Sequence, residues 1–486
     1  MIRLSHLLQD LVQDPLYGDP MIEHVTDDSR EVYPGALFVA LRGSRGDGTQ
    51  HIAEAAARGA VAALVDRDCQ RTDSVIPLYH VPDLAQRRAL LAARLYGFPG
   101  ARLHCIGVTG TNGKTTCAHL AAQLLNSVGR RAAVVGTAGH GFPGALQPAS
   151  HTTPGALVLQ GLLADLANAG ATDVVMEVSS HALDQQRVAE IAFSGAVFTN
   201  LTRDHLDYHG TMEAYAAAKA RLFDVPSLCY AVLCEDDAFG RALRLRLATR
   251  SLTVLGFGVH AGDVRVLHQH ENESGLHLTL QTPLGSLDLS TRLYGHFNAL
   301  NIAAITAVML CEGYTLGQIA QGFLLAQPVP GRMERFGGGR DPLVVVDYAH
   351  TPDALQKALE AVRVSVPGRL WCVFGCGGDR DQGKRPQMGR IAAELSDYLV
   401  LTDDNPRSEA PEVIIADICA GLRATDSARV VHDRKLAIRT AIADARAGDG
   451  VLVAGKGHET WQEIGAVRHP FSDQQVVAQA LRERAP

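Results

Sequence analysis

Short apolar runs rich in Val, Ile and Leu alternate with longer stretches rich in Ala and Leu along most of the chain. The short runs have the length of buried strands, and the longer stretches have the length of helices. This alternation is typical of an α/β fold with largely parallel sheets. The clearest predicted strands are Leu103–Val108, Asp173–Glu177, Gly195–Phe198, Leu343–Val346, Leu370–Phe374, Tyr398–Thr402 and Val451–Ala454.

Two clusters rich in Gly and Pro, at 97–100 and 328–331, interrupt this pattern and are typical of linkers. A chain of 486 residues also predicts about two to four domains. The last block has enough predicted strands and helices to form a doubly wound unit of its own. We therefore predict three domains, at 1–98, 99–331 and 332–486.

Composition and charge narrow the class of protein. Hydrophobic residues make up 47% of the chain and charged residues 20%, which is ordinary for a globular protein. The formal net charge of −7 argues against general nucleic-acid binding. The nine Cys form no C-x-x-C pair, so we expect reduced thiols in a cytoplasmic protein. No apolar run reaches about 18 residues, so no membrane span is predicted.

A glycine-rich loop follows the first central strand and precedes an Ala/Leu helix predicted at Cys117–Ser127. Small residues allow backbone N–H groups to converge on phosphate oxygens at a helix N-terminus. Lys114 can reach the β- and γ-phosphates, and the Thr115 hydroxyl can bind Mg²⁺. Val108 stands where the general P-loop pattern has its first Gly, so the loop is a shorter version. The predicted nucleotide-binding residues are Gly110, Thr111, Asn112, Gly113, Lys114, Thr115 and Thr116.

Three residues downstream of the loop are candidates for metal or phosphate chemistry. Glu177 ends a predicted strand, and parallel strands end at the same crevice, so it can hold Mg²⁺ there. The alternative for Glu177 is a cap or a surface salt bridge. His205 lies in a loop rich in titratable groups and can bind a metal or orient phosphate. Lys219 lies in an Ala-rich helix, where periodicity alone predicts an exposed lysine.

Together these segments resemble the Mur ligase family. The loop G-T-N-G-K-T-T, the strand end E-V-S-S-H, the run N-L-T-x-D-H-L-D-Y-H-G and the segment K-x-x-L-F have the family's order and spacing. The segments G-H-F-N, G-R-M-E, D-Y-A-H-T-P-D and G-K-G-H-E belong to the same pattern, and the resemblance covers essentially the whole chain. The D-N-P-R sequence at 404–407 is similar to that of the diaminopimelate-adding members.

The resemblance implies a three-domain α/β fold with a central P-loop ATPase domain and a doubly wound C-terminal domain. It implies an ATP-dependent ligase, with Mg²⁺ as cofactor, that works as a monomer in peptidoglycan precursor synthesis. The D-Glu carboxylate of UDP-N-acetylmuramoyl-L-alanyl-D-glutamate would form an acyl phosphate, which the amine of meso-2,6-diaminopimelate would then attack.

The resemblance also implies roles for particular residues. Lys114, Glu177, His205 and Lys219 would be catalytic. Thr115, Glu177, His205 and Lys219 would serve the metal, and Lys219 would be carbamylated. The ATP site would include Asn298, Arg332 and Asp347. The UDP-sugar dipeptide would contact Asp27, Ser29, Ser44, Arg45, Gly46, His151, Thr152, Thr153, Ser179, Gln185 and Arg187. Diaminopimelate would contact Arg380, Asp404, Asn405, Pro406, Arg407, Gly455 and Glu459.

Two positions depart from the family pattern, because His151 and Cys234 stand where Asn is common. Four other functions remain open: a lysine-adding ligase of the same family, a folylpolyglutamate synthase, a P-loop switch ATPase and a nucleotide-sugar binding module. The segments around Ser29 and Arg407 argue against the first two. The shortened loop and the acids downstream argue against a switch ATPase. A pure binding module would need neither Lys114 nor Glu177.

Overall fold

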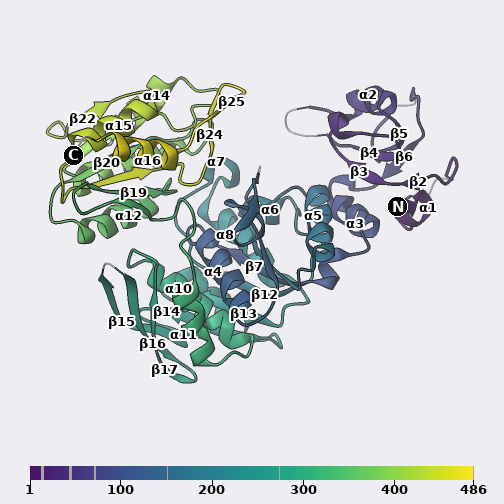
Figure 1. Ribbon diagram of the computed structural model, residues 1–486. Helices are drawn as coiled ribbons and strands as arrows, with labels where there is room; N and C mark the ends of the chain where they lie inside the picture. Colours follow the sequence, from purple (N-terminus) through teal and green to yellow (C-terminus); the bar gives the residue numbers. More distant parts are fainter. Residues whose placement is uncertain (13–15, 43–45, 71–72, 150, 273, 485–486) are drawn as a thin grey trace. The chain divides into compact units, whose positions relative to one another are not determined.

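The computed structural model describes residues 1–12, 16–42, 46–70, 73–149, 151–272 and 274–484. Figure 1 shows a mixed α/β chain, as the hydrophobic pattern predicts. The chain divides into two compact units. The first unit contains 1–107, 131–194 and 224–228, and the second contains 108–130, 195–223 and 229–486.

The first unit begins with a four-stranded parallel sheet of order β3-β4-β5-β6. Successive side chains of a strand point to opposite faces, so Leu37 and Val39 enter one core while Phe38 and Ala40 enter another. The elements of this part are β1 Ile2–Arg3, α1 Leu4–Leu7, β2 Met21–Ile22, β3 His24–Thr26, η1 Ser29–Glu31, β4 Ala36–Ala40, η2 Gly48–His51, α2 Ile52–Ala57, β5 Ala60–Asp66, β6 Leu78–Val81, α3 Leu84–Leu95 and η3 Pro99–Arg102.

A second group of strands in the first unit has the order β10-β9-β8-β11, in which β8 and β11 are parallel. Its helix α5 packs against α3 of the preceding part. The strands β7 and β12 contribute residues to both units. The elements are β7 His104–Thr109, β8 Ala132–Gly136, β9 Gly139–Phe142, β10 Ala145–Gln147, α5 Ala156–Asn168, β11 Asp173–Glu177, α6 Ser180–Asp184 and β12 Phe193–Phe198.

The second unit begins at the P loop and continues with the parallel strands β12, β13 and β14. An antiparallel meander of β15, β16 and β17 follows, which the prediction of largely parallel sheets did not include. The alternating burial of β16 directs one face of the meander inward. The elements are α4 Lys114–Ser127, α7 Leu206–His209, α8 Met212–Ala220, η4 Arg221–Asp224, β13 Tyr230–Cys234, α9 Ala238–Leu247, β14 Thr253–Gly258, β15 Val264–Asn272, β16 Gly275–Thr282, β17 Gly285–Thr291, α10 Asn298–Cys311 and α11 Leu316–Leu325.

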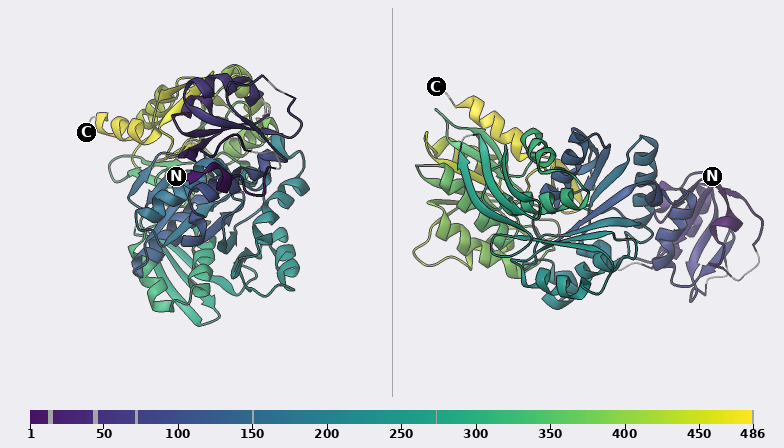
Figure 2. Two further views of the ribbon diagram at one scale, coloured as in Figure 1. Left: turned by 90° about the vertical axis from the view of Figure 1, so that its right-hand side faces the viewer. Right: turned by 90° about the horizontal axis from the view of Figure 1, so that it is seen from below.

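The C-terminal sheet has the order β18-β19-β23-β20-β21-β22, parallel except for the edge strand β18. One hydrophobic core lies against α12, α13 and α14 and another against α15 and α16, which confirms the doubly wound arrangement. In Figures 1 and 2 the yellow helix α16 lies at the outside of this part. The elements are β18 Glu334–Gly337, β19 Leu343–Asp347, α12 Pro352–Ser365, β20 Leu370–Phe374, η5 Gln382–Lys384, α13 Arg385–Leu395, β21 Tyr398–Leu401, α14 Pro411–Cys419, β22 Ala428–Val430, α15 Arg434–Asp444, β23 Gly450–Ala454, β24 Trp461–Ile464, β25 Val467–Pro470 and α16 Asp473–Glu483.

The predicted strands are confirmed to within a residue or two, whereas the helix after the P loop begins earlier than predicted. That helix, α4, begins at Lys114, so both Lys114 and Thr115 lie in its first turn. The N-cap Gly113 has a φ of +87°, a conformation that glycine adopts without strain. The start of the helix therefore lies inside the phosphate-loop motif itself.

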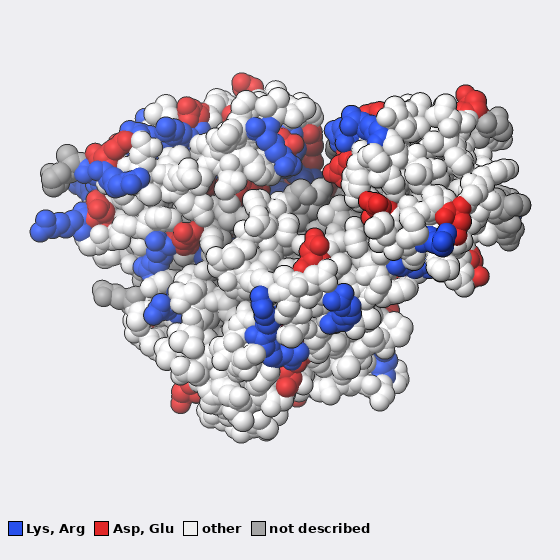
Figure 3. All heavy atoms as spheres, turned by 45° about the vertical axis from the view of Figure 1, so that its right-hand side comes forward, with Lys and Arg blue, Asp and Glu red and all other residues white. Residues whose placement is uncertain are grey.

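Surface charge is mixed where it can be seen. On the face drawn in Figure 3, basic and acidic side chains are interspersed rather than gathered into one patch of either sign. None of the helices in the described residues is long and apolar enough to cross a membrane.

Candidate functional site

The P loop is held in shape by its own lysine. Lys114 Nζ donates to the carbonyl oxygens of Gly110 at 2.9 Å and Thr111 at 2.8 Å. Gly110 has a φ of +148°, and a Cβ there would lie 1.8 Å from Thr199 Oγ1. The loop therefore requires glycine at this position for both its backbone conformation and its close approach to the next strand.

The segment that follows β12 braces the P loop. Thr199 Oγ1 donates to the Asn112 carbonyl at 2.6 Å, and the Asn112 N–H donates to Asn200 Oδ1 at 2.9 Å. The Thr111 N–H donates to the Asn200 carbonyl at 2.8 Å, and the Thr202 N–H donates to Thr111 Oγ1 at 3.0 Å. The sequence analysis noted this run for its titratable groups, but its first residues serve to fix the loop.

Lys219 is the largest departure from the periodicity-based prediction, which was wrong about its exposure. Its side chain is only 1% exposed, and Nζ donates to the Gly110 carbonyl at 2.7 Å. The ammonium also lies 4.3 Å from the centroid of the Tyr215 ring. Burial, reinforced by the nearby Lys114 cation, holds the pKa of Lys219 well below its ordinary value. The two lysines thus share one carbonyl oxygen beneath the P loop.

The carboxylate of Asp204 lies within a group of three basic side chains, of which only His205 was assigned a role from the sequence. His205 Nε2 lies 3.3 Å from Asp204 Oδ2, and Lys384 Nζ lies 3.6 Å from Oδ1. His350 Nε2 lies 3.9 Å from Oδ2. Burial opposes ionisation of Asp204, but Lys384, with smaller contributions from the histidines, outweighs it and lowers the pKa of Asp204. The group joins the loop after β12 to the loops that follow β19 and β20 of the C-terminal sheet.

Other hydrogen bonds also connect the P-loop region to the C-terminal part. Arg332 Nη2 donates to Thr115 Oγ1 at 2.7 Å, and the guanidinium lies 4.4 Å from the centroid of the Tyr348 ring. Asn112 Nδ2 donates to Asp353 Oδ2 at 2.9 Å. The structure therefore brings predicted ATP residues from distant segments of the second unit next to one another.

Asp347 and Asn298 are buried at the ends of their elements. Asp347 accepts from the Met333 and Ala349 N–H groups, each at 2.8 Å, while burial raises its pKa. Asn298 donates from Nδ2 to the Tyr294 carbonyl at 2.6 Å and begins α10. Both side chains are thereby fixed in position.

A compact polar cluster in the first unit contains Glu177 and five of the eleven predicted contacts to the UDP-sugar dipeptide. Glu177 Oε1 accepts from the Thr137 N–H at 2.7 Å, and its own carbonyl accepts from Thr153 Oγ1 at 2.7 Å. Thr137 Oγ1 also donates to Thr152 Oγ1 at 2.9 Å. The Ser179 N–H donates to Thr153 Oγ1 at 3.1 Å, and the Ser179 hydroxyl caps α6.

Arg187 extends this cluster by donating to the Thr153 carbonyl at 2.9 Å and to Gln185 Oε1 at 2.7 Å and 3.0 Å. His151 is exposed beside it. The structure thus brings several predicted site residues together in one hydrogen-bonded cluster, which contains Thr152, Thr153, Glu177, Ser179, Gln185 and Arg187.

The remaining N-terminal candidates lie near the ends of the parallel sheet. Ser29 Oγ donates to Glu54 Oε2 at 2.8 Å, and Asp27 Oδ2 lies 3.3 Å from Arg88 Nη1. Gly46 is exposed. Ser44 and Arg45 lie outside the described residues.

The predicted amino-acid site is built on a buried hydrogen-bond network after β21 and β23. Asn405 Nδ2 donates to Glu459 Oε2 at 2.9 Å. Lys456 Nζ donates to Asn405 Oδ1 at 3.0 Å and to Glu459 Oε2 at 2.7 Å. Burial raises the pKa of Glu459, although Lys456 opposes the shift. Lys456, fully buried in G-K-G-H-E, was not assigned a role from the sequence.

Arg407 lies at the border of this network with an unusual backbone. Its φ is +55°, and its N–H donates to the Glu463 carbonyl at 3.1 Å. The side chain donates from Nη1 to the Gly378 carbonyl at 2.7 Å and lies 3.3 Å from Glu463 Oε2. The left-handed backbone of Arg407, its N–H hydrogen bond and its side-chain contacts therefore hold the guanidinium at a defined position.

Gly455, Pro406 and Arg380 complete the predicted amino-acid site. A Cβ on Gly455 would lie 2.5 Å from Asp404 Oδ2, so only glycine leaves room for that carboxylate. Pro406 is buried, and its carbonyl would contact a Cβ on Gly378. Arg380 is exposed on the same loop, with Cγ near Gly377. All seven predicted residues therefore lie on loops at the same edge of the C-terminal sheet.

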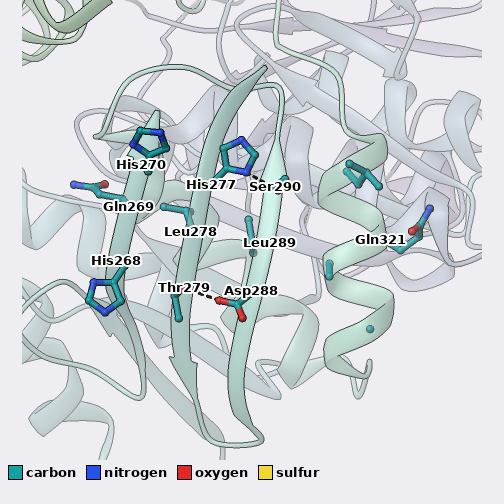
Figure 4. Close-up of a pocket in the computed structure, with 13 residues that line it drawn as sticks. His268, Gln269, His270, His277, Leu278, Thr279, Asp288, Leu289, Ser290 and Gln321 are labelled. Carbon is teal, nitrogen blue, oxygen red and sulfur yellow. Dashed lines mark hydrogen bonds between the residues drawn. The ribbon is translucent and has the colours of Figure 1, made fainter. Parts of the chain in front are cut away.

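Among the described residues, no group of three or more His, Cys, Asp or Glu side chains is arranged to hold a metal ion. A groove of about 530 Å³ is lined by the meander β15–β17 and by α11 (Figure 4). Its polar contacts include His277 with Ser290 at 2.8 Å and Thr279 with Asp288 at 2.7 Å. None of the predicted site residues lines it.

The braced P loop, with the adjoining buried lysine, defines a nucleotide-binding α/β protein, and its doubly wound C-terminal sheet carries a second polar cluster. The chain belongs to the Mur ligase family. Three family models match it: the "Mur ligase family, catalytic domain" at 21–92, the "Mur ligase middle domain" at 108–309 and the "Mur ligase, glutamate ligase domain" at 331–457.

Similar proteins extend over nearly the whole chain. A Pseudomonas aeruginosa UDP-N-acetylmuramoyl-L-alanyl-D-glutamate–2,6-diaminopimelate ligase is 50% identical over 95% of this chain and 96% of that protein. The Chromobacterium violaceum protein of the same name is 49% identical over 95% and 94%. A solved structure of a ligase of that name is 36% identical, covers 99% of both chains and has a TM-score of 0.68.

Proposed function

We propose that this protein catalyses ATP-dependent amide bond formation between UDP-N-acetylmuramoyl-L-alanyl-D-glutamate and meso-2,6-diaminopimelate. The observation that carries the proposal is the buried network around Asn405, Lys456 and Glu459, built on the D-N-P-R segment that is similar to that of diaminopimelate-adding ligases. Relatives that bear the name of such a ligase match it over 95% of the chain. The reaction belongs to peptidoglycan precursor synthesis in the cytoplasm.

The three parts of the chain divide the work. Residues 1–98 bind the UDP-sugar, 99–331 bind ATP and 332–486 bind the incoming amino acid. The matched family models at 21–92, 108–309 and 331–457 support borders close to these. The fixed carbonyl and hydroxyl contacts of Thr152, Thr153, Ser179 and Arg187 support a preorganised site for the dipeptide.

ATP binds with its phosphates on the P loop. The N–H groups at the start of α4, with Lys114 and Arg332, neutralise charge as the γ-phosphoryl group passes to the D-Glu carboxylate. Asn298 and Asp347 form further contacts to the nucleotide. The acyl phosphate then reacts with the amine of the third substrate, which forms the amide and releases phosphate.

Mg²⁺ fits the donor set of these segments. This ion prefers oxygen ligands and usually binds through one or two protein groups together with phosphate and water. In the second unit the Thr115 hydroxyl at the helix start is suited to it, and His205 lies beside the Asp204 carboxylate. In the first unit the Glu177 carboxylate is an oxygen donor of the kind that this ion prefers. When bound, the ion neutralises phosphate charge.

The burial of Lys219 supports its proposed carbamylation. Only the neutral amine attacks CO₂, and the lowered pKa of the buried Lys219 increases the fraction of that form. The uncharged nitrogen forms a bond to the carbon of CO₂ and releases one proton to water, so the neutral amine becomes an anionic carbamate next to Lys114. The new negative charge is suited to a metal ligand or to orienting a cation.

Product formation is the direct test of the proposal. Purified protein with Mg-ATP and UDP-N-acetylmuramoyl-L-alanyl-D-glutamate is offered meso-diaminopimelate or L-lysine, and phosphate and the UDP-tripeptide are measured. We expect both products with diaminopimelate alone. Preference for lysine would contradict the assignment of the third site. Phosphate release without any amino acid would instead indicate a switch ATPase.

Arg407 is the residue we propose to select diaminopimelate, because a guanidinium binds a carboxylate through two hydrogen bonds. Hydrogen bonds to charged groups contribute about 1.5–3 kcal/mol, so Arg407→Ala should raise the KM for diaminopimelate about 10- to 150-fold. The KM for ATP should stay within about twofold of the wild-type value. An equal rise in both constants would remove Arg407 from the amino-acid site.

A further inference from the structure

A completely buried ion pair joins the first residues of the last two helices. Arg434 Nε and Nη2 donate to the two carboxylate oxygens of Asp473, both at 2.8 Å. Neither side chain is exposed to solvent. Arg434 begins α15 and Asp473 begins α16, which pack against each other on one face of the C-terminal sheet (Figure 1).

Two physical effects oppose the placement of a charged arginine at the start of α15. The positive end of the helix dipole lies at the N-terminus, so a cation in the first turn of α15 is unfavourable. Desolvation of a buried pair commonly cancels its Coulombic gain, and apolar replacements are often as stable. Its Nη1 also has no hydrogen-bond partner among the described residues. Stability alone therefore does not account for the choice of a buried arginine at this position.

A third contact of Arg434 points to that role. Nη2 also donates to the carbonyl of Ala454 at 2.9 Å, and Ala454 is the last residue of β23. The next residue, Gly455, has no room for a Cβ beside Asp404. The chain then continues to Lys456 and Glu459 of the buried network. Arg434 therefore fixes the backbone from which the amino-acid site extends.

Charge links the pair to the same site. Burial disfavours the guanidinium, but Asp473, with contributions from Asp404 and Glu459, outweighs it and raises the pKa of Arg434. The guanidinium thus interacts electrostatically with both site carboxylates. Those carboxylates are the groups that an incoming ammonium would contact.

We propose that Arg434, held by Asp473, is a positioning residue for the incoming amino acid, acting through the Ala454 carbonyl on Gly455, Asp404 and Glu459. This inference rests on the proposed function of that site. A purely structural pair would affect folding and all substrates alike, whereas a positioning pair affects one substrate.

The test replaces both partners with apolar residues of similar size, as Arg434→Met with Asp473→Leu, so that no buried charge remains unpaired. We expect a melting temperature close to that of the wild type and a KM for the amino acid raised about tenfold or more. The KM for ATP should remain unchanged. A folded double variant with a wild-type KM for the amino acid would overturn the proposal.

The matched control is Arg439→Met, which removes an exposed ion pair between the same two helices, since Arg439 Nη2 lies 2.5 Å from Glu483 Oε2. It should leave the KM for the amino acid unchanged, and a rise equal to that of the double variant would overturn the proposal. If the double variant does not fold, the single variant Arg434→Lys is tested instead. Lysine keeps the charge but cannot make all three hydrogen bonds, so an unchanged KM there would also overturn the proposal.

The wild-type protein is measured first, with diaminopimelate and with lysine. If it uses lysine, the diaminopimelate assignment fails, and the variants are compared by their KM for lysine. The experiments can therefore contradict the assignment of diaminopimelate as substrate without contradicting the positioning role of Arg434, and the reverse.

Discussion

At the scale of single residues, Lys219 shows how burial changes the properties of an ordinary side chain, because it lowers the pKa of the amine. Its neighbours in α8 include the buried Tyr215 four residues before it and the buried Ala218 beside it. Because residues i and i+4 share a helix face, Tyr215 marks the inward face on which Lys219 lies. The aromatic residue was the one sequence feature that could have predicted this burial.

Lys219→Met should stabilise the protein at neutral pH while abolishing most of its activity. The folded-state pKa lies below the ordinary value of 10.5, so the unfolded chain binds the extra proton more readily. The resulting loss of stability is present at neutral pH and is regained as pH rises toward 10.5. Methionine removes this dependence, while product formation should fall about 100-fold.

Thermal unfolding between pH 7 and pH 10 measures the first effect, and tripeptide formation measures the second. The control is Lys435→Met, because Lys435 is exposed and its removal should change neither quantity. A Lys219→Met protein with a wild-type pH dependence of its melting temperature would contradict a lowered pKa for the buried Lys219.

At the scale of elements, the P loop and α4 form one structure that depends on backbone conformation. The loop is fixed from within by Lys114 and from outside by Thr199, Asn200 and Thr202. Such preorganisation keeps the N–H groups directed at phosphate before ATP arrives. Substitution of Gly110 in the P loop should therefore affect ATP binding, whereas substitution of Gly129 beyond the end of α4 should not, although both glycines have a positive φ.

Gly110→Ala should abolish ATP binding, because its Cβ would lie 1.8 Å from Thr199 Oγ1 in a conformation disfavoured for alanine. The matched control is Gly129→Ala, at a φ of +90° beyond the end of α4, where a Cβ meets nothing within 4 Å. That control should cost about 1 kcal/mol of stability and leave ATP affinity unchanged. Calorimetric titration with ATP distinguishes them, and equal affinities would show that the loop tolerates the change.

At the scale of the molecule, the second unit joins the P loop to the C-terminal sheet through a few polar contacts. Asn112 donates to Asp353 at the start of α12, Arg332 donates to Thr115, and Lys384 lies 3.6 Å from Asp204. Each contact connects a segment of the proposed nucleotide site with a loop of the sheet that carries the proposed amino-acid site. We infer that ATP affinity depends on the C-terminal part.

Asp353→Ala should therefore weaken ATP binding, although Asp353 lies about 240 residues from the P loop in sequence. Loss of a hydrogen bond to a carboxylate, about 1.5–3 kcal/mol when buried and less when partly exposed, predicts a KM for ATP raised about three- to tenfold. The control is Lys357→Ala, which removes only the ion pair of Lys357 with Asp353 within α12. If both variants raise the KM for ATP equally, the Asn112 contact is not responsible.

The sequence by itself determined the parts that depend on local patterns. Hydrophobic runs predicted the parallel strands of the C-terminal sheet, since a strand covered on both faces is apolar throughout. The order of glycines and Lys114 predicted the phosphate loop, because backbone conformation and charge there are local properties. The prediction began α4 three residues late, since its first turn is also the phosphate motif.

Only the tertiary structure decided which residues meet. The group of Asp204, His205, His350 and Lys384 comes from three separate loops, and the network of Asn405, Lys456 and Glu459 comes from two. Lys219 and Arg434 are common surface residue types whose roles arise from burial, which no local pattern of charge encodes. Burial and proximity depend on how distant segments pack, and this is why the chemistry of these residues appears only in the folded protein.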